Sequence, residues 1–81
     1  MTLGPQLLRF IRDELATDPG AIDENAQLID EGILDSMALM RLITFLEERA
    51  GVRVPDDEVV PDNFQTIASI EALVARLQAR P

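Results

Sequence analysis

One serine in this sequence stands where phosphoryl chemistry would be easy to accommodate. Ser36 follows Asp35, which is a good N-cap, so the pattern places Ser36 in the first turn of a helix. The segment reads Gly32-Ile33-Leu34-Asp35-Ser36-Met37. Free backbone N–H groups and the positive end of the helix dipole favour negative charge at such a position. Because a first-turn hydroxyl also points to solvent, a phosphodiester on Ser36 would cost the fold little.

The same pair of residues has an ordinary structural interpretation. Asp-Ser is among the commonest capping signals at helix starts, and most such pairs have no further role. A plain helical interaction module, in which Ser36 only contributes to the cap, is therefore the competing hypothesis. The pattern along the rest of the chain has to decide between the two.

The composition excludes most catalytic chemistry. The chain has 81 residues, 15 acidic and seven basic, and a formal charge of −8. It contains no His and no Cys, so no Ser-His or Cys-His pair and no cysteine zinc site can form. Ser36 lacks a base that could activate it, so we expect no enzymatic activity. The negative charge opposes binding to nucleic acid and to anionic membranes.

Neither a metal site nor a membrane span is expected. The acidic clusters at residues 18–25, 30–36 and 56–58 lack the alternating ligands and central glycine of an EF-hand loop. No apolar run approaches the roughly 20 residues that a membrane helix needs.

Apolar periodicity predicts three longer helices, at residues 5–16, 36–50 and 67–79. Gly51 is the expected C′ residue of the second, and Thr66 the expected cap of the last. Each helix carries one apolar stripe. The stripes are Leu7, Leu8, Ile11 and Leu15, then Leu39, Leu42, Ile43, Leu46 and Ala50, and finally Ile67, Ile70, Leu73, Val74 and Leu77.

Two connecting segments complete the expected fold. Residues 20–35 form a long loop, pinned to the helices by its apolar side chains. These are Ile22, Leu28, Ile29, Ile33 and Leu34. Residues 56–65 are polar and interrupted by Pro61, which permits only a short helical turn or two, with Val59, Val60 and Phe64 facing the core. The prediction is an all-α four-helix bundle with three longer helices and one short one, a single domain over residues 1–81 with its core in about 7–77.

This whole pattern resembles the acyl carrier and peptidyl carrier proteins, the phosphopantetheine-binding domains. Their pattern is a glycine, a short gap and Asp-Ser-Leu at the start of the second of four helices, and here Met37 takes the place of the leucine. The approach at residues 28–32, the helix end at 46–55 and the junction at 63–70 resemble the same family. The resemblance extends from about residue 7 to residue 77.

The resemblance implies a role for each part of the motif. Ser36 would be the attachment site of 4′-phosphopantetheine, which a separate phosphopantetheinyl transferase takes from coenzyme A, with Asp35 as the supporting N-cap. The thiol of that group would carry an acyl or aminoacyl group as a thioester. An adenylating ligase or acyltransferase would load it, and condensing or transferring enzymes would receive it. The missing cysteine fits, because the reactive sulfur would come from the cofactor.

The motif also implies a type of carrier. The Leu-Asp-Ser-Met form resembles free-standing aminoacyl and D-alanyl carriers of amino-acid loading or secondary metabolism. In fatty-acid carriers the second and fifth positions after the serine tend to be acidic, whereas here they are Ala38 and Arg41. We expect partners to bind a mostly apolar surface beside Ser36. Its residues are Leu34, Met37, Met40 and Arg41.

Several alternatives stay open at this point. Met37 and Met40 would serve equally well as packing beneath the preceding loop, since apolar residues at helical spacing are more often core than interface. A carrier of fatty-acid synthesis is the alternative function. The N-terminus does not read as a signal peptide, so we expect a cytoplasmic protein, and Met1 with the short tails favours a free-standing monomer.

Overall fold

The computed structural model describes residues 3–15, 22–23 and 25–79, and every regular element in that part of the chain is helical. The elements are α1 (Leu3–Phe10), the π-helical turn η1 (Ile11–Leu15), α2 (Ser36–Ala50), the 3₁₀ turn η3 (Asp56–Glu58), α3 (Pro61–Phe64) and α4 (Ile67–Ala79). The expected all-α architecture, with three longer helices and one short one, is confirmed.

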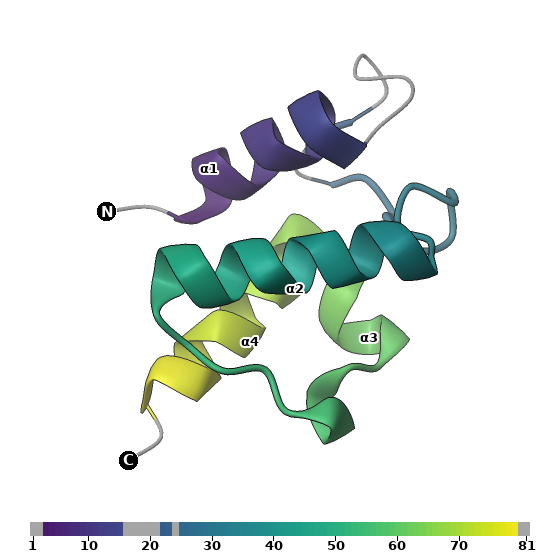
Figure 1. Cartoon of the computed structure of the whole chain (residues 1–81). Helices are drawn as coiled ribbons and strands as arrows, with labels where there is room; N and C mark the ends of the chain where they lie inside the picture. Colours follow the sequence, from purple (N-terminus) through teal and green to yellow (C-terminus); the bar gives the residue numbers. More distant parts are fainter. Residues whose placement is uncertain (1–2, 16–21, 24, 80–81) are drawn as a thin grey trace.

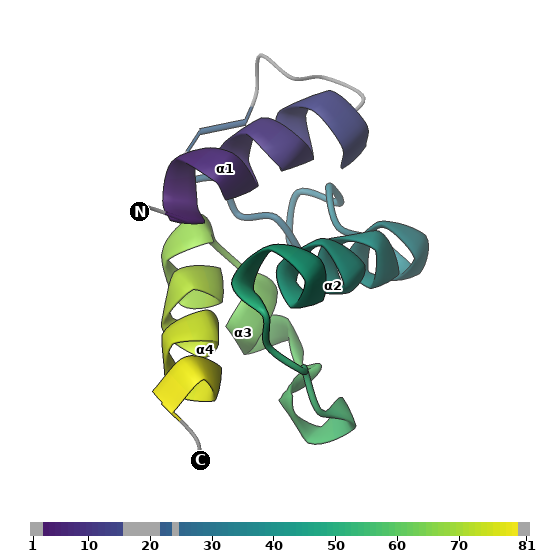
Figure 2. The ribbon, with the colours of Figure 1, turned by 60° about the vertical axis from the view of Figure 1, so that its left-hand side comes forward.

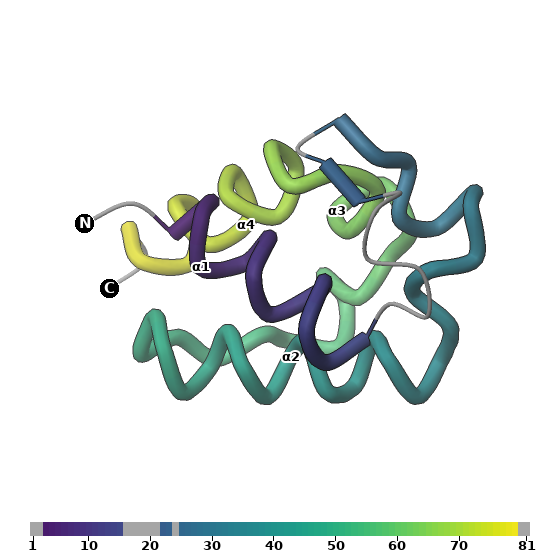
Figure 3. Tube along the Cα trace, turned by 90° about the horizontal axis from the view of Figure 1, so that it is seen from above, coloured from purple at the N-terminus to yellow at the C-terminus, as the bar shows by residue number. Residues whose placement is uncertain are grey.

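The helices pack around one hydrophobic core. Helix α1 lies over the seam between α2 and α4, as the view from above shows (Figure 3), while α3 and α4 lie together beneath α2 (Figure 1). The rings of Phe10 and Phe45 stack between α1 and α2, with centroids 4.2 Å apart and planes at 20°. The guanidinium of Arg49 lies 5.6 Å from the centroid of the Phe45 ring.

Helix α2 has the bounds that its capping residues predict. At its start the Asp35 carboxylate accepts a hydrogen bond from the backbone N–H of Ala38. At its end Gly51 adopts the left-handed conformation, with φ 66° and ψ 29°. Glycine is the residue that tolerates this conformation best, so the helix stops there.

The first helix differs from the prediction at its beginning. It starts at Leu3, two residues before Pro5. Proline is tolerated there because the first four N–H groups of a helix have no partner within it. Beyond Phe10 the helix widens into η1, and the Arg12 guanidinium donates two hydrogen bonds to the carbonyl of Ile22, at 3.0 and 2.7 Å. The predicted end of this helix at Ala16 lies outside the described residues.

The core is aliphatic except for one aromatic ring. Phe64 is fully buried, and the three predicted helix stripes supply most of the rest. Their buried members are Leu7, Ile11, Leu42, Ile43, Leu46, Ile67, Ile70, Leu73, Val74 and Leu77. The expectation that Val60 faces the core is wrong, because its side chain is 42% exposed. Val60 has the extended backbone that is favoured before proline, and its neighbour Val59 packs partly against the core instead.

The loop before α2 is held down by its apolar residues, as predicted. Ile22, Leu28 and Leu34 are buried, while Ile29 and Ile33 are partly buried against the same core. Gly32 has φ 75° and provides the tight turn in this loop, a conformation that a side chain would strain.

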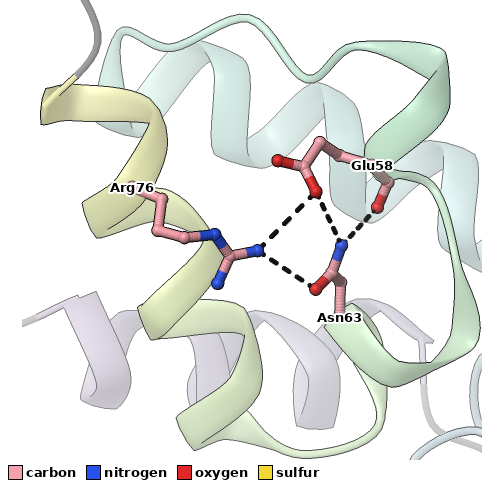
Figure 4. Close-up of polar contacts among 3 residues, drawn as sticks. All are labelled: Glu58, Asn63 and Arg76. Atoms are coloured by element: carbon pink, nitrogen blue, oxygen red, sulfur yellow. Dashed lines mark hydrogen bonds and ion pairs between the residues drawn. The ribbon is translucent and has the colours of Figure 1, made fainter.

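Three polar side chains hold the short α3 against α4 (Figure 4). The Asn63 amide donates to the backbone carbonyl of Glu58 at 2.7 Å and to its carboxylate at 3.2 Å. The Arg76 guanidinium donates to the Asn63 side-chain oxygen at 3.2 Å and lies 3.7 Å from the Glu58 carboxylate. This network connects η3, α3 and α4, so it fixes the segment that follows α2.

Candidate functional site at Ser36

Ser36 is the first residue of α2. The start of this helix lies at the edge of the molecule, where the long loop meets it (Figure 1). The Asp35 carboxylate accepts from the Ala38 N–H at 2.8 Å, and the Asp35 carbonyl accepts from the Leu39 N–H at 2.8 Å. Within the described part of the chain, the N–H groups of Ser36 and Met37 have no acceptor. They are therefore available to an anion beside the Ser36 hydroxyl.

The two serines of the chain differ in their freedom to react. Ser36 is exposed, and its hydroxyl makes no hydrogen bond to any described residue. Ser69 is partly buried, and its hydroxyl donates to the Thr66 carbonyl and accepts from the Thr66 N–H, both at 2.9 Å. The Thr66 hydroxyl in turn accepts from the Ser69 N–H at 3.1 Å, which confirms Thr66 as the cap of α4. Ser36 is thus the serine whose oxygen is free.

Hydrogen bonds and buried side chains fix the position of the loop that precedes Ser36. The carbonyl of Leu28 accepts from the N–H groups of Ile33 and Leu34, both at 3.0 Å. Leu28 is fully buried and Leu34 is 5% exposed, so both ends of this turn are anchored in the core. The first turn of α2 follows directly from an anchored residue.

The expectation that Leu34 belongs to a partner-binding surface is therefore wrong. Its side chain fills the core beneath the start of α2, where it is needed for the loop to hold its position. Met37 and Met40 behave in the opposite way, with exposed fractions of 76% and 62%. The alternative that they pack beneath the preceding loop is excluded by this exposure.

The second and fifth residues after Ser36 are Ala38 and Arg41, neither of them acidic. Ala38 is buried at 9% exposure, so it packs into the core. Arg41 is exposed but engaged, since its guanidinium donates to the backbone carbonyl of Glu14 at 3.1 Å and lies 3.8 Å from the Glu14 carboxylate. Its positive charge is therefore paired with the Glu14 carboxylate in η1.

Two polar residues have structural roles in the segments before and after α2 that sequence patterns did not indicate. Gln65 accepts hydrogen bonds from the loop before Ser36, across more than 30 residues of sequence. Glu47 accepts from the N–H of Val54 at 3.0 Å, which ties the extended link to α2. Hydrogen bonds over such separations leave no local periodicity, so no signal in the sequence could have identified these residues.

We expect Asp35→Ala to lower the free energy of unfolding by about 1 kcal/mol, because the Ala38 N–H loses its acceptor. Asp35→Ser should retain most of the stability, since serine caps about as well as aspartate. Urea denaturation followed by circular dichroism measures the difference. Asp57→Ala is the matched control, as Asp57 is exposed in η3 and makes no hydrogen bond to the described residues. Equal losses for Asp35→Ala and Asp57→Ala would contradict the capping role.

Comparison with known proteins decides the family. Residues 5–77 match the family described as the phosphopantetheine attachment site. The chain belongs to the phosphopantetheine-attachment family. Its members hold 4′-phosphopantetheine covalently, and this protein is a carrier that holds its cargo as a thioester on that group. Carriers of this family are in general not catalysts themselves.

Relatives of known name include both aminoacyl and acyl carriers. The probable acyl carrier protein PigG of Serratia sp. (strain ATCC 39006) is 38% identical over 60 residues, which cover 74% of this chain and 69% of PigG. The D-alanyl carrier protein of Listeria monocytogenes serotype 4a is 33% identical over 79 residues, 98% of this chain and 97% of that protein. The acyl carrier protein of Renibacterium salmoninarum is 30% identical, with 90% and 88% covered.

Two solved structures contain chains of the same fold. A chain in a crystal structure of an FAD-dependent dehydrogenase superposes with a TM-score of 0.75 and 33% identity, covering 85% of this chain and 99% of that one. The matched region is 85% of the 81 residues of this chain and 99% of the other chain, so the other chain has about 70 residues. A chain in the complex of the Bradyrhizobium japonicum glycine:[carrier protein] ligase with glycylated carrier protein has a TM-score of 0.64, with 25% identity over 89% of this chain.

The residues around Ser36 fit the group that the family holds. The exposed Ser36 hydroxyl has no hydrogen-bond partner among the described residues and would suit a covalently attached phosphate, with the N–H groups of Ser36 and Met37 beside it. Among the described residues no helix is long and apolar enough to cross a membrane.

Proposed function

We propose that this chain carries an amino acid on 4′-phosphopantetheine attached to Ser36. The free Ser36 hydroxyl at the first turn of α2 is the observation that carries the choice of residue, because the hydroxyl of Ser69 is used in the cap of α4. When bound, the group supplies a flexible thiol on which the cargo is held as a thioester.

The chain's own contribution to attachment is the Ser36 oxygen as nucleophile. No basic side chain hydrogen-bonds this hydroxyl within the described residues, and the sequence contains no histidine and no lysine. The base that accepts the hydroxyl proton therefore has to come from a phosphopantetheinyl transferase. The Ser36 oxygen bonds to the phosphorus of the pantetheine phosphate in coenzyme A, the pyrophosphate bond of coenzyme A breaks, and adenosine 3′,5′-bisphosphate leaves. We propose that this takes place in the cytoplasm, where coenzyme A and ATP are supplied.

Two comparisons and one structural feature support an amino acid as cargo. The D-alanyl carrier of Listeria is similar over nearly the full length of both chains. One solved structure of the same fold is a glycylated carrier protein bound to its ligase. The buried Ala38 and the engaged Arg41 give α2 a less acidic face than the fatty-acid carriers have. An ATP-dependent adenylating ligase is the matching loading enzyme.

We propose that partner enzymes bind the exposed face of α2 at Met37 and Met40, with Arg41 at its border. Methionine side chains adapt to different apolar partners. The exposed acids Asp30 and Glu31 lie just before this face in the sequence and can steer partners with a basic rim toward it. The complementary enzyme surface is therefore an apolar patch bordered by basic residues.

A second candidate function concerns what happens after loading. The chain that superposes best of the two above comes from a structure of an FAD-dependent dehydrogenase. This favours a carrier that presents its aminoacyl thioester to a flavin enzyme for oxidation, a role compatible with the first.

Loading by purified ligases tests the cargo class. We expect the phosphopantetheinylated protein to gain glycine or alanine from an aminoacyl-adenylating ligase and ATP, at a kcat/KM at least about tenfold above that of acyl transfer by fatty-acid-synthase enzymes, a difference of about 1.4 kcal/mol. Intact-protein mass spectrometry measures both, with the Ser36→Ala variant as the blank. Efficient loading by the fatty-acid enzymes alone would refute the aminoacyl assignment.

A further inference from the structure

One glutamine outside the site accepts hydrogen bonds from three successive backbone N–H groups of the loop that leads to Ser36. Gln65 lies at the junction of α3 and α4, directly after the buried Phe64. Its backbone carbonyl accepts from the N–H of Leu28 at 2.7 Å. Its side-chain oxygen accepts from Ile29 at 3.1 Å and from Asp30 at 3.2 Å. Figure 2 shows the loop passing beneath α1 and beside the start of α4 on its way to α2.

A second pair of hydrogen bonds connects Leu28 to the residues just before the cap of α2. Leu28, held by Gln65, accepts through its own carbonyl from Ile33 and Leu34. Leu34 is buried and precedes Asp35, the cap of α2. The orientation of the first turn of α2 is therefore linked, through the hydrogen bonds of Leu28, to Gln65. Gln65 itself makes no hydrogen bond to Ser36 or to the cap residue Asp35 and lies far from both in the sequence.

We infer that Gln65 is a positioning residue for the reaction at Ser36. By accepting from Ile29 and Asp30, its side chain holds the loop in the one conformation that presents the Ser36 hydroxyl to the transferase. Without that oxygen, residues 28–34 of the loop are held to the junction of α3 and α4 by their apolar side chains and one backbone hydrogen bond, and they sample other conformations. An enzyme that needs one orientation then reacts only with the competent fraction. This inference rests on the proposed attachment at Ser36.

Substitutions that remove or retain the acceptor test the inference. Gln65→Met keeps the length of the side chain but removes the oxygen, and Gln65→Asn withdraws the oxygen by one methylene. We expect both to lower kcat/KM for phosphopantetheine transfer about tenfold, as the loss of two modest hydrogen bonds allows. Gln65→Glu retains an oxygen at the same place and should stay within about threefold of the wild type.

The matched control is Gln78→Met in the last turn of α4. Gln78 is exposed and its amide lies 3.4 Å from the carbonyl of Ala50, at the opposite end of α2 from Ser36. The same substitution there should leave transfer at the wild-type rate. Because two loss variants are compared, a failure of Gln65→Met to fold still leaves Gln65→Asn as the test.

Amide hydrogen exchange gives a readout that does not depend on any transferase. In the unmodified Gln65→Met and Gln65→Asn variants, the Ile29 and Asp30 amides should exchange about tenfold faster, with α4 unchanged. A wild-type chain that never accepts phosphopantetheine refutes the proposed function, while the exchange data still test the link to the loop. A wild-type chain that is modified, with both loss variants modified at the same rate, refutes the positioning role.

Discussion

The Ser36→Ala variant should accept no phosphopantetheine from coenzyme A, whereas the native chain gains one group. The reason is that the nucleophilic oxygen is removed and the hydroxyl of Ser69 is engaged with Thr66. Because the Ser36 side chain is exposed and makes no hydrogen bond to the described residues, the free energy of unfolding should change by no more than about 0.5 kcal/mol. Intact-mass measurement after incubation with a broad-specificity transferase records the modification.

Ser69→Ala is the matched control for this experiment. It should lose about 1 kcal/mol of stability, because the Thr66 N–H loses its acceptor while the Thr66 hydroxyl still caps α4, and it should still accept the group. This reverses the pattern of Ser36→Ala, which keeps stability and loses modification. A Ser36→Ala variant that is still modified would contradict the assignment of the attachment site.

The largest effect on stability is expected at Phe64. Its ring is fully buried and is the one aromatic side chain in the core of this chain. Phe64→Ala should lower the free energy of unfolding by about 3–5 kcal/mol through lost burial and the cavity left behind. A domain of 81 residues has a total stability of about 4–12 kcal/mol, so the variant should be largely unfolded at modest urea concentrations.

Phe45→Ala provides the comparison for Phe64. Phe45 is only partly buried, where it stacks on Phe10 and lies beneath Arg49, so its loss should cost about 1–2 kcal/mol. Urea denaturation followed by circular dichroism measures both variants. A cost for Phe64→Ala no greater than that for Phe45→Ala would show that the core is not organised around Phe64.

The helix that carries the site could be predicted to the residue, because its signals are local. The Asp35 carboxylate accepts a hydrogen bond from the N–H of Ala38, three residues later, and Gly51 adopts the left-handed conformation that ends the helix. Each end of α2 is therefore determined by residues within one turn of it. The apolar stripes were equally readable, since burial follows the helical period. Thr66 as the cap of α4 belongs to the same class of local signals.

What the sequence did not reveal depends on contacts between distant segments. Leu34 and Met37 are both apolar neighbours of Ser36, yet one is in the core and the other is exposed. The difference arises because Leu34 belongs to the loop that Leu28 anchors, and no periodicity marks that turn. Gln65 shows the same limit more strongly, since its partners lie more than 30 residues away.

Locating the modified residue in the native chain tests the carrier mechanism most directly. Cleavage after arginine separates the two serines, because residues 13–41 contain Ser36 and residues 54–76 contain Ser69. After incubation with coenzyme A and a broad-specificity phosphopantetheinyl transferase, the added mass of one phosphopantetheine should be found on the 13–41 peptide. A native chain that gains no such mass, or gains it on the 54–76 peptide, would contradict Ser36 as the site that makes this protein a carrier.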